Sequence, residues 1–206
     1  MADEAHPEWN AALEEVIKKE GEQAEGLYWL HSQAALWAQK RNDYIQIPAI
    51  VLATLTGFFS ATSDMLPPIA IGGLSVFVGI LNTINSYYKF SQRSEGHRIA
   101  SLWYLKTYKK IEMELALPIS QRTPADPLLK ELSEGMGRIS ETAPQVPEAL
   151  NKAYAARFKD EGVARPLGTN GLDPIKIYRA ASVPRTPSAP QPVETPRPPV
   201  KISVMV

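Results

Sequence analysis

Two long runs without a charged residue constrain this 206-residue chain more than any other feature. The first covers residues 44–63 and the second covers residues 65–88. An α-helix needs about 20 residues to cross the ~30 Å hydrocarbon core of a bilayer, and each run is long enough. A helix buried inside a soluble bundle usually keeps a charged face, and neither run has one. We therefore predict two transmembrane helices rather than two core helices of a soluble protein.

The connection between the two runs predicts how they are joined. Its one charged residue is Asp64, and two prolines, Pro67 and Pro68, follow after Met65 and Leu66. A proline cannot continue the first helix, but it suits the opening turn of the second, where its missing N–H had no partner. Such a short connection forces the two helices to be antiparallel neighbours. The sequence therefore predicts a hairpin with spans near residues 44–63 and 68–88.

The flanks of the hairpin predict its orientation. Basic residues precede the first span and follow the second, and none lies in the connection: they are Lys40, Arg41, Lys89, Arg93 and Arg98. The positive-inside rule then places both termini in the cytosol. Aromatic residues lie near the same boundaries, as an interfacial belt would: Trp37, Tyr44, Tyr87, Tyr88 and Trp103. We expect a multi-pass membrane protein that contacts lipid. An alternative use of the basic stretch after the hairpin is the binding of anionic headgroups, which applies best to Lys89, Arg93 and Arg98.

Small residues recur at helical spacing along both spans. We call the nine of them the small-residue stripe: Ala49, Ala53, Gly57, Ala61, Gly72, Ser75, Gly79, Asn82 and Ser86. Small residues let the backbones of membrane helices approach closely. We expect the stripe to be the contact between the two spans, with Leu81 facing lipid. The alternative is an oligomeric pore lined by Ser75, Asn82 and Ser86.

The segments on either side of the hairpin predict two helical arms. Residues 1–43 have the apolar spacing of amphipathic helices, with a break near Gly21. A proline-free stretch from residue 89 to 117 predicts a long helix. Residues 1–43 hold nine acids and four bases, a net of -5, whereas residues 89–110 hold six bases and one acid, a net of +5. We expect the arms to pair, with the acidic side chains of one at the height of the basic side chains of the other: Glu22, Glu25, Lys109 and Lys110.

The rest of the chain changes character along its length. A third helix is predicted over residues 127–141, and a short helix is predicted after Pro147. A tail that favours an extended polyproline conformation follows, and the last six residues read as a strand or hydrophobic anchor. Its prolines are Pro184, Pro187, Pro190, Pro192, Pro196, Pro198 and Pro199. The predicted fold is all-α, with N-terminal amphipathic helices (1–43), a transmembrane hairpin (44–88), a C-terminal helical region (89–160) and the proline-rich tail (161–206).

The sequence contains no pattern that predicts catalysis. It has no cysteine, and its three histidines are scattered, although His31 and His97 could face each other between the arms. A metal site would need a third ligand, which the sequence does not offer. There is no glycine-rich phosphate loop and no nucleophile elbow. The 22 basic and 22 acidic residues balance, so no net charge attracts nucleic acid. We expect no enzyme activity, no cofactor, no metal and no small-molecule substrate.

The order of parts resembles the SLATT family of two-transmembrane effector domains. The resemblance rests on "HSQAALWAQKRNDY" before the hairpin, "SQRSEGHRIASLWYLKTYKKIEMEL" after it, and the closing "ETAPQVPEAL". It covers roughly residues 27–150, and it implies membrane pore formation upon a signal. The additional N-terminal helix and the long tail depart from a minimal domain of that family.

Two functions remain open at this point. In the first, the hairpin sits in a membrane while the arms and tail hold an adjacent protein shell or assembly, as in a minor capsid protein of a virus with an internal membrane. Ordering an extended tail costs about 1–2 kcal/mol per residue, which contacts with partners have to offset. Extended tails that cross their neighbours are a feature of large shells, so this tether is the function that we expect. The alternative is a SLATT-like pore-forming effector.

Overall fold

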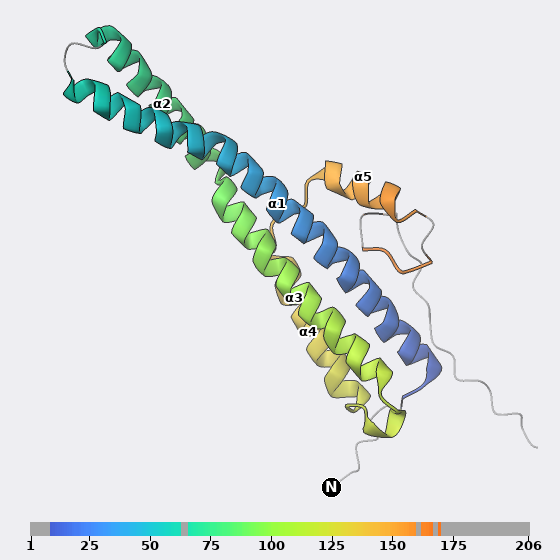
Figure 1. Ribbon diagram of the computed structural model, residues 1–206. Coiled ribbons are helices and arrows are strands. Elements are labelled where there is room, and N and C mark those ends of the chain that lie inside the picture. The colour runs from blue at the N-terminus through green and yellow to red at the C-terminus, as the bar shows by residue number, and fades with distance from the viewer. Residues whose placement is uncertain (1–8, 63–65, 160–161, 167–168, 170–206) are drawn as a thin grey trace, which may run out of the picture. The chain divides into compact units, whose positions relative to one another are not determined.

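The protein is helical wherever its structure is described. The computed structural model describes residues 9–62, 66–159, 162–166 and 169, and within those ranges it contains helices and no strand (Figure 1). The chain divides into residues 1–173 and 174–206, and every described residue belongs to the first unit. The all-α prediction is confirmed for this part. The proline-rich tail from Pro184 and the strand predicted for the last six residues lie outside the described residues. The helices are α1 (Ala11–Ala61), α2 (Pro68–Tyr88), α3 (Phe90–Ala116), the 3₁₀ turn η1 (Ile119–Gln121), α4 (Ala125–Thr142) and α5 (Glu148–Arg157).

Helix α1 carries both the N-terminal arm and the first span. It begins after Asn10, whose side chain accepts a hydrogen bond from the Leu13 backbone N–H, and it continues for 51 residues. At 1.5 Å per residue this helix is about 75 Å long. The break predicted near Gly21 is wrong. A Cβ atom at this position would lie 2.9 Å from Ile111 Cγ2, so the glycine allows close approach to α3 instead of ending the helix.

The second span and the arm that follows it are separate helices. Pro67 precedes α2 and Pro68 occupies its first position, as the sequence predicts. Between α2 and α3, Lys89 has a φ of 51°, the one positive φ among the described non-glycine residues. The chain is therefore interrupted at the predicted end of the hairpin rather than running through as one straight helix.

Helix α1 contacts α2 along one part of its length and α3 along another (Figure 1). The core of the arms lies where α4 joins α1 and α3. One apolar cluster combines Ile17 of α1 with Ile111 of α3 and with Leu128 and Leu132 of α4. A second cluster centres on three other buried side chains, Ala100, Tyr104 and Ile139. The arms therefore have a hydrophobic core of their own, in which α4 covers the α1–α3 pair.

The end of the arms farthest from the hairpin is closed by polar contacts. The indole N–H of Trp9 donates a hydrogen bond to the Thr123 carbonyl, with 3.0 Å between the heavy atoms. Arg122 forms an ion pair with Glu14 and also lies over the Trp9 ring, 5.0 Å from its centroid. These contacts join the start of α1 to the segment between α3 and α4.

Helix α5 packs on α1 through aromatic rings and a glycine. Trp29 contacts the rings of Tyr154 and Phe158, with centroids 5.6 and 5.4 Å apart. Gly26 lies beneath this contact, and a Cβ atom there would be 2.5 Å from Pro166 Cγ and 2.6 Å from the Tyr154 hydroxyl. Only a residue without a side chain allows this approach.

The charges of the arms are paired differently from the prediction. Glu25 contributes to the electrostatic environment of Lys109, so the two arms have the expected relative height. The expected ion pairs between the arms are nevertheless wrong, because three of the four side chains, Glu22, Lys109 and Lys110, pair with other residues. Lys109 pairs with Glu112, Lys110 with Glu131, and Lys18 with Glu22. Residues three or four apart on one helix lie close together at little entropic cost, which favours local pairs.

A candidate membrane hairpin and a buried histidine pair

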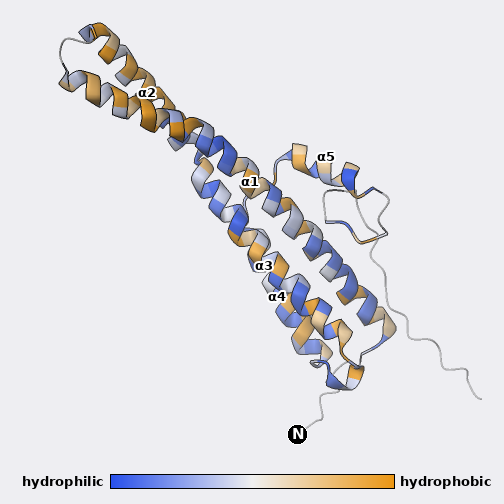
Figure 2. Ribbon diagram, viewed as in Figure 1, coloured by the Kyte–Doolittle hydropathy of each residue, from blue (hydrophilic) through white to orange (hydrophobic). Residues whose placement is uncertain are grey.

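The surface of the hairpin is apolar and exposed. Figure 2 shows the hydrophobic colouring concentrated on α2 and the C-terminal part of α1, whereas the arms are mixed. Both segments are long and apolar enough to cross a membrane, and only 6% of each apolar window is buried within the chain. The core helix of a soluble protein would be mostly buried. Soluble monomers rarely expose such a large apolar patch, and here it includes Ile47, Ile50, Val51, Leu55, Phe58, Ile69, Val76, Phe77 and Ile80.

The contact between the spans consists mainly of larger side chains. The less exposed residues fall on one face of each helix: Ala49, Leu52, Thr56 and Phe59 on α1, and Ile71, Leu74, Val78, Leu81 and Asn85 on α2. Near the arms, the Asn85 amide donates a hydrogen bond to Gln46 Oε1 at 2.7 Å. Inside a bilayer such a hydrogen bond would add to the packing of the two helices, because lipid offers an amide no hydrogen-bond partner.

The small-residue stripe is not this contact. Of its nine residues only Ala49 is buried, and eight are exposed: Ala53, Gly57, Ala61, Gly72, Ser75, Gly79, Asn82 and Ser86. A Cβ atom at any of the three glycines would meet nothing within 4 Å. The prediction that the stripe closes the hairpin is therefore wrong, as is the lipid-facing position predicted for Leu81. Mainly larger side chains occupy the contact face, and the stripe residues other than Ala49 are exposed.

The sequence analysis missed the Gln46–Asn85 pair. Both residues are amides inside uncharged, largely apolar runs, and that composition was the available signal. Their pairing depends on which faces meet, which spacing alone did not reveal. Asn85 Oδ1 is buried and has no hydrogen-bond partner among the described residues.

The two histidines predicted to face each other between the arms do so. His31 of α1 and His97 of α3 are 4% and 3% exposed, and their Nδ1 atoms are 3.0 Å apart. The Tyr104 ring also contacts His31, with centroids 5.3 Å apart. One Nδ1 must carry a proton and donate it, and the other must accept, so this hydrogen bond is lost when both rings are protonated.

Burial changes the acidity of this pair. Burial, followed by the charge of His97, lowers the pKa of His31 from 6.5 to about 4. Burial also lowers the pKa of His97, and the nearby Arg93 charge acts in the same direction. No group of three or more potential metal ligands occurs in the described part of the chain. The histidine pair can join α1 to α3, but two ligands do not make the tetrahedral site that zinc prefers.

Among the described residues, a groove lies between α3 and α4. Its volume is about 190 Å³, and its lining combines apolar and charged side chains, among them Trp103, Lys106, Lys110, Glu131, Arg138 and Ile139. Pockets for small molecules are usually larger, roughly 300–1,000 Å³, and mostly apolar. The groove therefore does not suggest a substrate site.

Comparison with protein-family models, with curated proteins and with solved structures finds no match to this chain. The resemblance to the SLATT family therefore stays a prediction from the sequence. The functional argument has to rest on the hairpin, the arms and the surfaces that they expose.

Proposed function

We propose that this protein is a non-enzymatic two-pass membrane anchor that tethers a bilayer to an adjacent protein assembly. The observation that carries the proposal is that the exposed apolar surface of the hairpin and the packed core of the arms occupy different parts of the chain, which α1 joins. The hairpin exposes apolar side chains and buries few, whereas the arms enclose a core between α1, α3 and α4. Because α1 is continuous through both regions, an arm fixed to a partner would also be fixed to the membrane.

The arms expose an apolar surface that a protein partner could cover. Ile99, Leu102 and Trp103 of α3 are 46%, 51% and 50% exposed. They are spaced by three and four residues and so share one face of the helix. Exposed apolar residues gathered on one face favour a protein contact over a solvated surface. This face supports the tether without naming the partner.

The finer proposal is a minor capsid or other structural protein of a virus with an internal membrane, with both termini on the cytosolic side. It rests on the composition of the proline-rich tail, which an extended-peptide mode of binding would use. Deleting residues 183–206 should leave the protein inserted and helical, but it should no longer co-purify with its assembly. Retention of the truncated protein in the assembly would contradict a role for the tail.

The second candidate is a pore-forming effector, and the outward position of the small-residue stripe favours it. Ser75, Asn82 and Ser86 are exposed on α2, where a second copy could reach them. Small residues at an exposed face allow helices of separate copies to approach closely. In a pore, these three polar side chains would line the conducting path.

Ion leakage from loaded liposomes distinguishes the two candidates. A tether should not leak, and the double substitution Ser75→Leu/Asn82→Leu should change nothing. A pore should leak, the double substitution should abolish leakage, and deletion of residues 183–206 should have little effect. Val76→Leu/Ile80→Leu, which changes exposed apolar residues of the same helix, is the matched control. Leakage by the purified protein that the control retains and the double substitution loses would replace the tether with the pore.

A further inference from the structure

We propose that four cations at the junction of the hairpin and the arms bind the headgroups of anionic phospholipids. We call this surface the cationic collar, and it consists of Lys40, Arg41, Lys89 and Arg93. The inference rests on the proposed insertion of the hairpin in a bilayer. It goes further by assigning a class of lipid and the residues that select it.

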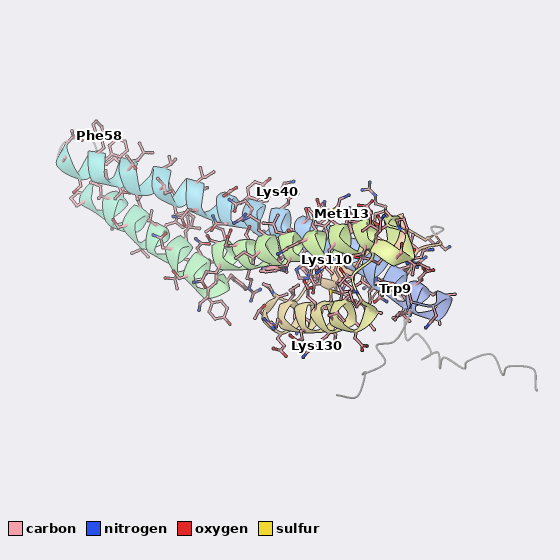
Figure 3. All side chains as sticks on the ribbon, turned by 90° about the horizontal axis from the view of Figure 1, so that it is seen from below. Trp9, Lys40, Phe58, Lys110, Met113 and Lys130 are labelled. Atoms are coloured by element: carbon pink, nitrogen blue, oxygen red, sulfur yellow. The ribbon has the colours of Figure 1, made fainter. Side chains whose placement is uncertain are left out.

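Contacts between the helices bring the four cations to one level. The Ser94 hydroxyl of α3 donates a hydrogen bond to the Ala35 carbonyl of α1 at 3.0 Å. The rings of Trp37 and Phe90 meet with centroids 6.4 Å apart. Lys40 and Arg41 follow Trp37 within about one turn of α1, and Lys89 precedes Phe90 directly. Figure 3 shows Lys40 on α1 between the hairpin, where Phe58 lies, and the arms, where Lys110 and Trp9 lie.

These cations differ from most of those farther along the arms. All four are exposed, and none forms an ion pair with an acid in the described ranges. The acids nearest to these cations in the sequence are Asp43 and Glu95. Asp43 accepts hydrogen bonds from Gln39 and Asn42 at 2.8 and 3.5 Å, and Glu95 pairs with Arg98. Cations of the arms mostly have carboxylate partners, as in Arg98–Glu95, Lys110–Glu131, Arg138–Glu134 and Lys152–Glu148. The positive charge of the collar is left for a partner outside the chain.

Aromatic rings place the collar at the depth of headgroups. The Arg41 guanidinium lies 4.2 Å from the centroid of the Trp37 ring. A stacked guanidinium keeps its N–H donors free at its edge, where they match the oxygens of a phosphate. Tyr87 and Tyr88 are 79% and 46% exposed directly before Lys89. Tyrosine and tryptophan favour the membrane–water interface. An anionic lipid can therefore place its acyl chains along the hairpin and its phosphate against the cations.

The break at Lys89 sets the direction of one of these cations. Lys89 has a left-handed backbone. Its side chain therefore does not follow the regular helical register of α2 or of α3. Glycine or asparagine is the usual residue in this conformation. A lysine there puts a flexible ammonium at the end of the apolar surface.

The test measures lipid selectivity in liposomes. The full-length protein is reconstituted in phosphatidylcholine with a trace of spin-labelled phosphatidylglycerol or spin-labelled phosphatidylcholine, and electron spin resonance gives the motionally restricted fraction of each. One lysine or arginine near an anionic membrane surface strengthens binding to that surface by on the order of fivefold. We therefore expect the protein to select phosphatidylglycerol over phosphatidylcholine by at least about fivefold at low salt. The selectivity should decrease at high salt, because exposed charges are screened.

Matched variants assign the effect to the collar. Lys40→Gln/Arg41→Gln/Lys89→Gln/Arg93→Gln should reduce the selectivity to about one. If the quadruple variant does not fold, the triple variant that keeps Lys89, and with it the backbone break, takes its place. Its selectivity should be intermediate. Lys130→Gln/Arg138→Gln/Lys152→Gln/Lys159→Gln removes the same charge from exposed sites on the arms and should keep the full selectivity.

Three results would overturn the inference. In the first, the inserted protein shows no selectivity for phosphatidylglycerol. In the second, the arm control loses the selectivity as fully as the collar variant does. In the third, inorganic phosphate abolishes the selectivity at an ionic strength where chloride does not. The collar would then bind a free phosphate ion rather than a lipid headgroup. Flotation with neutral liposomes separates these results from a failure of the proposed function. A protein that does not float is not a membrane anchor, whereas one that floats without selectivity lacks only the collar.

Discussion

At the scale of single residues, Gly26 permits the contact between α1 and α5. Gly26→Ala should destabilise the arms by about 1–3 kcal/mol, since the new methyl group would overlap Pro166 and the Tyr154 hydroxyl. Unfolding monitored by circular dichroism in detergent measures the change. Gly135→Ala is the control in α4, where a Cβ atom meets nothing within 4 Å, and it should stabilise by about 0.5–1 kcal/mol. A stabilising Gly26→Ala would mean that α5 does not pack there.

The buried His31–His97 pair should make the arms sensitive to acid. The pKa of His31 is about 4 in the folded protein, against 6.5 for an ordinary histidine. Between these pH values the unfolded chain binds a proton that the folded chain does not, so stability should be full above about pH 6.5 and decrease as the pH falls toward 4. Protonation of both rings would also place two N–H donors against each other.

Unfolding midpoints measured from pH 7 to pH 4 check this expectation. The groups around the pair that also carry charge or titrate are Arg93, which acts on His97, and Tyr104, which contacts His31 and whose pKa is raised by burial. His31→Gln should reduce the acid dependence, because it removes one of the two imidazoles whose pKa is lowered and keeps a polar side chain. An unchanged acid dependence in this variant would assign the effect to other residues.

At the scale of helices, the contact between α1 and α2 depends on aliphatic side chains on one face. Leu74→Ala should loosen the hairpin by about 1–2 kcal/mol, less than for a fully buried leucine because Leu74 is only half-buried. Val76→Ala removes an apolar side chain that is 65% exposed on the same helix and should be nearly silent. Unfolding in bicelles by steric trapping compares the two. Equal losses of hairpin stability in the two variants would contradict the assignment of Leu74 to the contact face of α2.

A substitution in the small-residue stripe distinguishes the α1–α2 contact within one copy from a contact between separate copies, because the stripe, apart from Ala49, lies outside the α1–α2 contact face. Gly79→Leu adds a side chain where nothing lies within 4 Å, so it should leave the hairpin of a single copy intact. It should disrupt association of separate copies if the stripe mediates it. Cross-linking in liposomes reports that association, and the Leu74→Ala variant shows what a loosened hairpin does to the same measurement.

At the scale of the whole molecule, the topology is open to a direct test. The chain has no cysteine, so single cysteines can be introduced without background labelling. Thr62→Cys lies at the end of α1 beside the hairpin connection, and Ser120→Cys lies in η1 at the end of the arms. A membrane-impermeant maleimide should label these positions from opposite sides of the bilayer, because the hairpin returns to the side from which it entered. Labelling of both from one side would contradict a membrane-spanning hairpin.

The sequence by itself determined the helical fold, the two long apolar helical segments and the start of the second of them at its prolines. These follow from local properties, namely the length of the uncharged runs, the missing N–H of proline and the periodicity of apolar residues. It also predicted that His31 and His97 meet, since the height of residues on antiparallel helices follows from the helical rise.

Only the tertiary structure decided which faces meet. Spacing placed the small-residue stripe on helical faces, but the rotation of α1 against α2 depends on how all side chains of both helices pack, and Leu74, Val78 and Leu81 pack at the contact. The local ion pair of Lys109 with Glu112 likewise replaced a predicted pair between the arms. Gly21 looked like a helix break because glycine is a poor helix former, yet contact with Ile111 outweighs that propensity. Local rules therefore define the helices, whereas their rotation and pairing are cooperative properties of the packed chain.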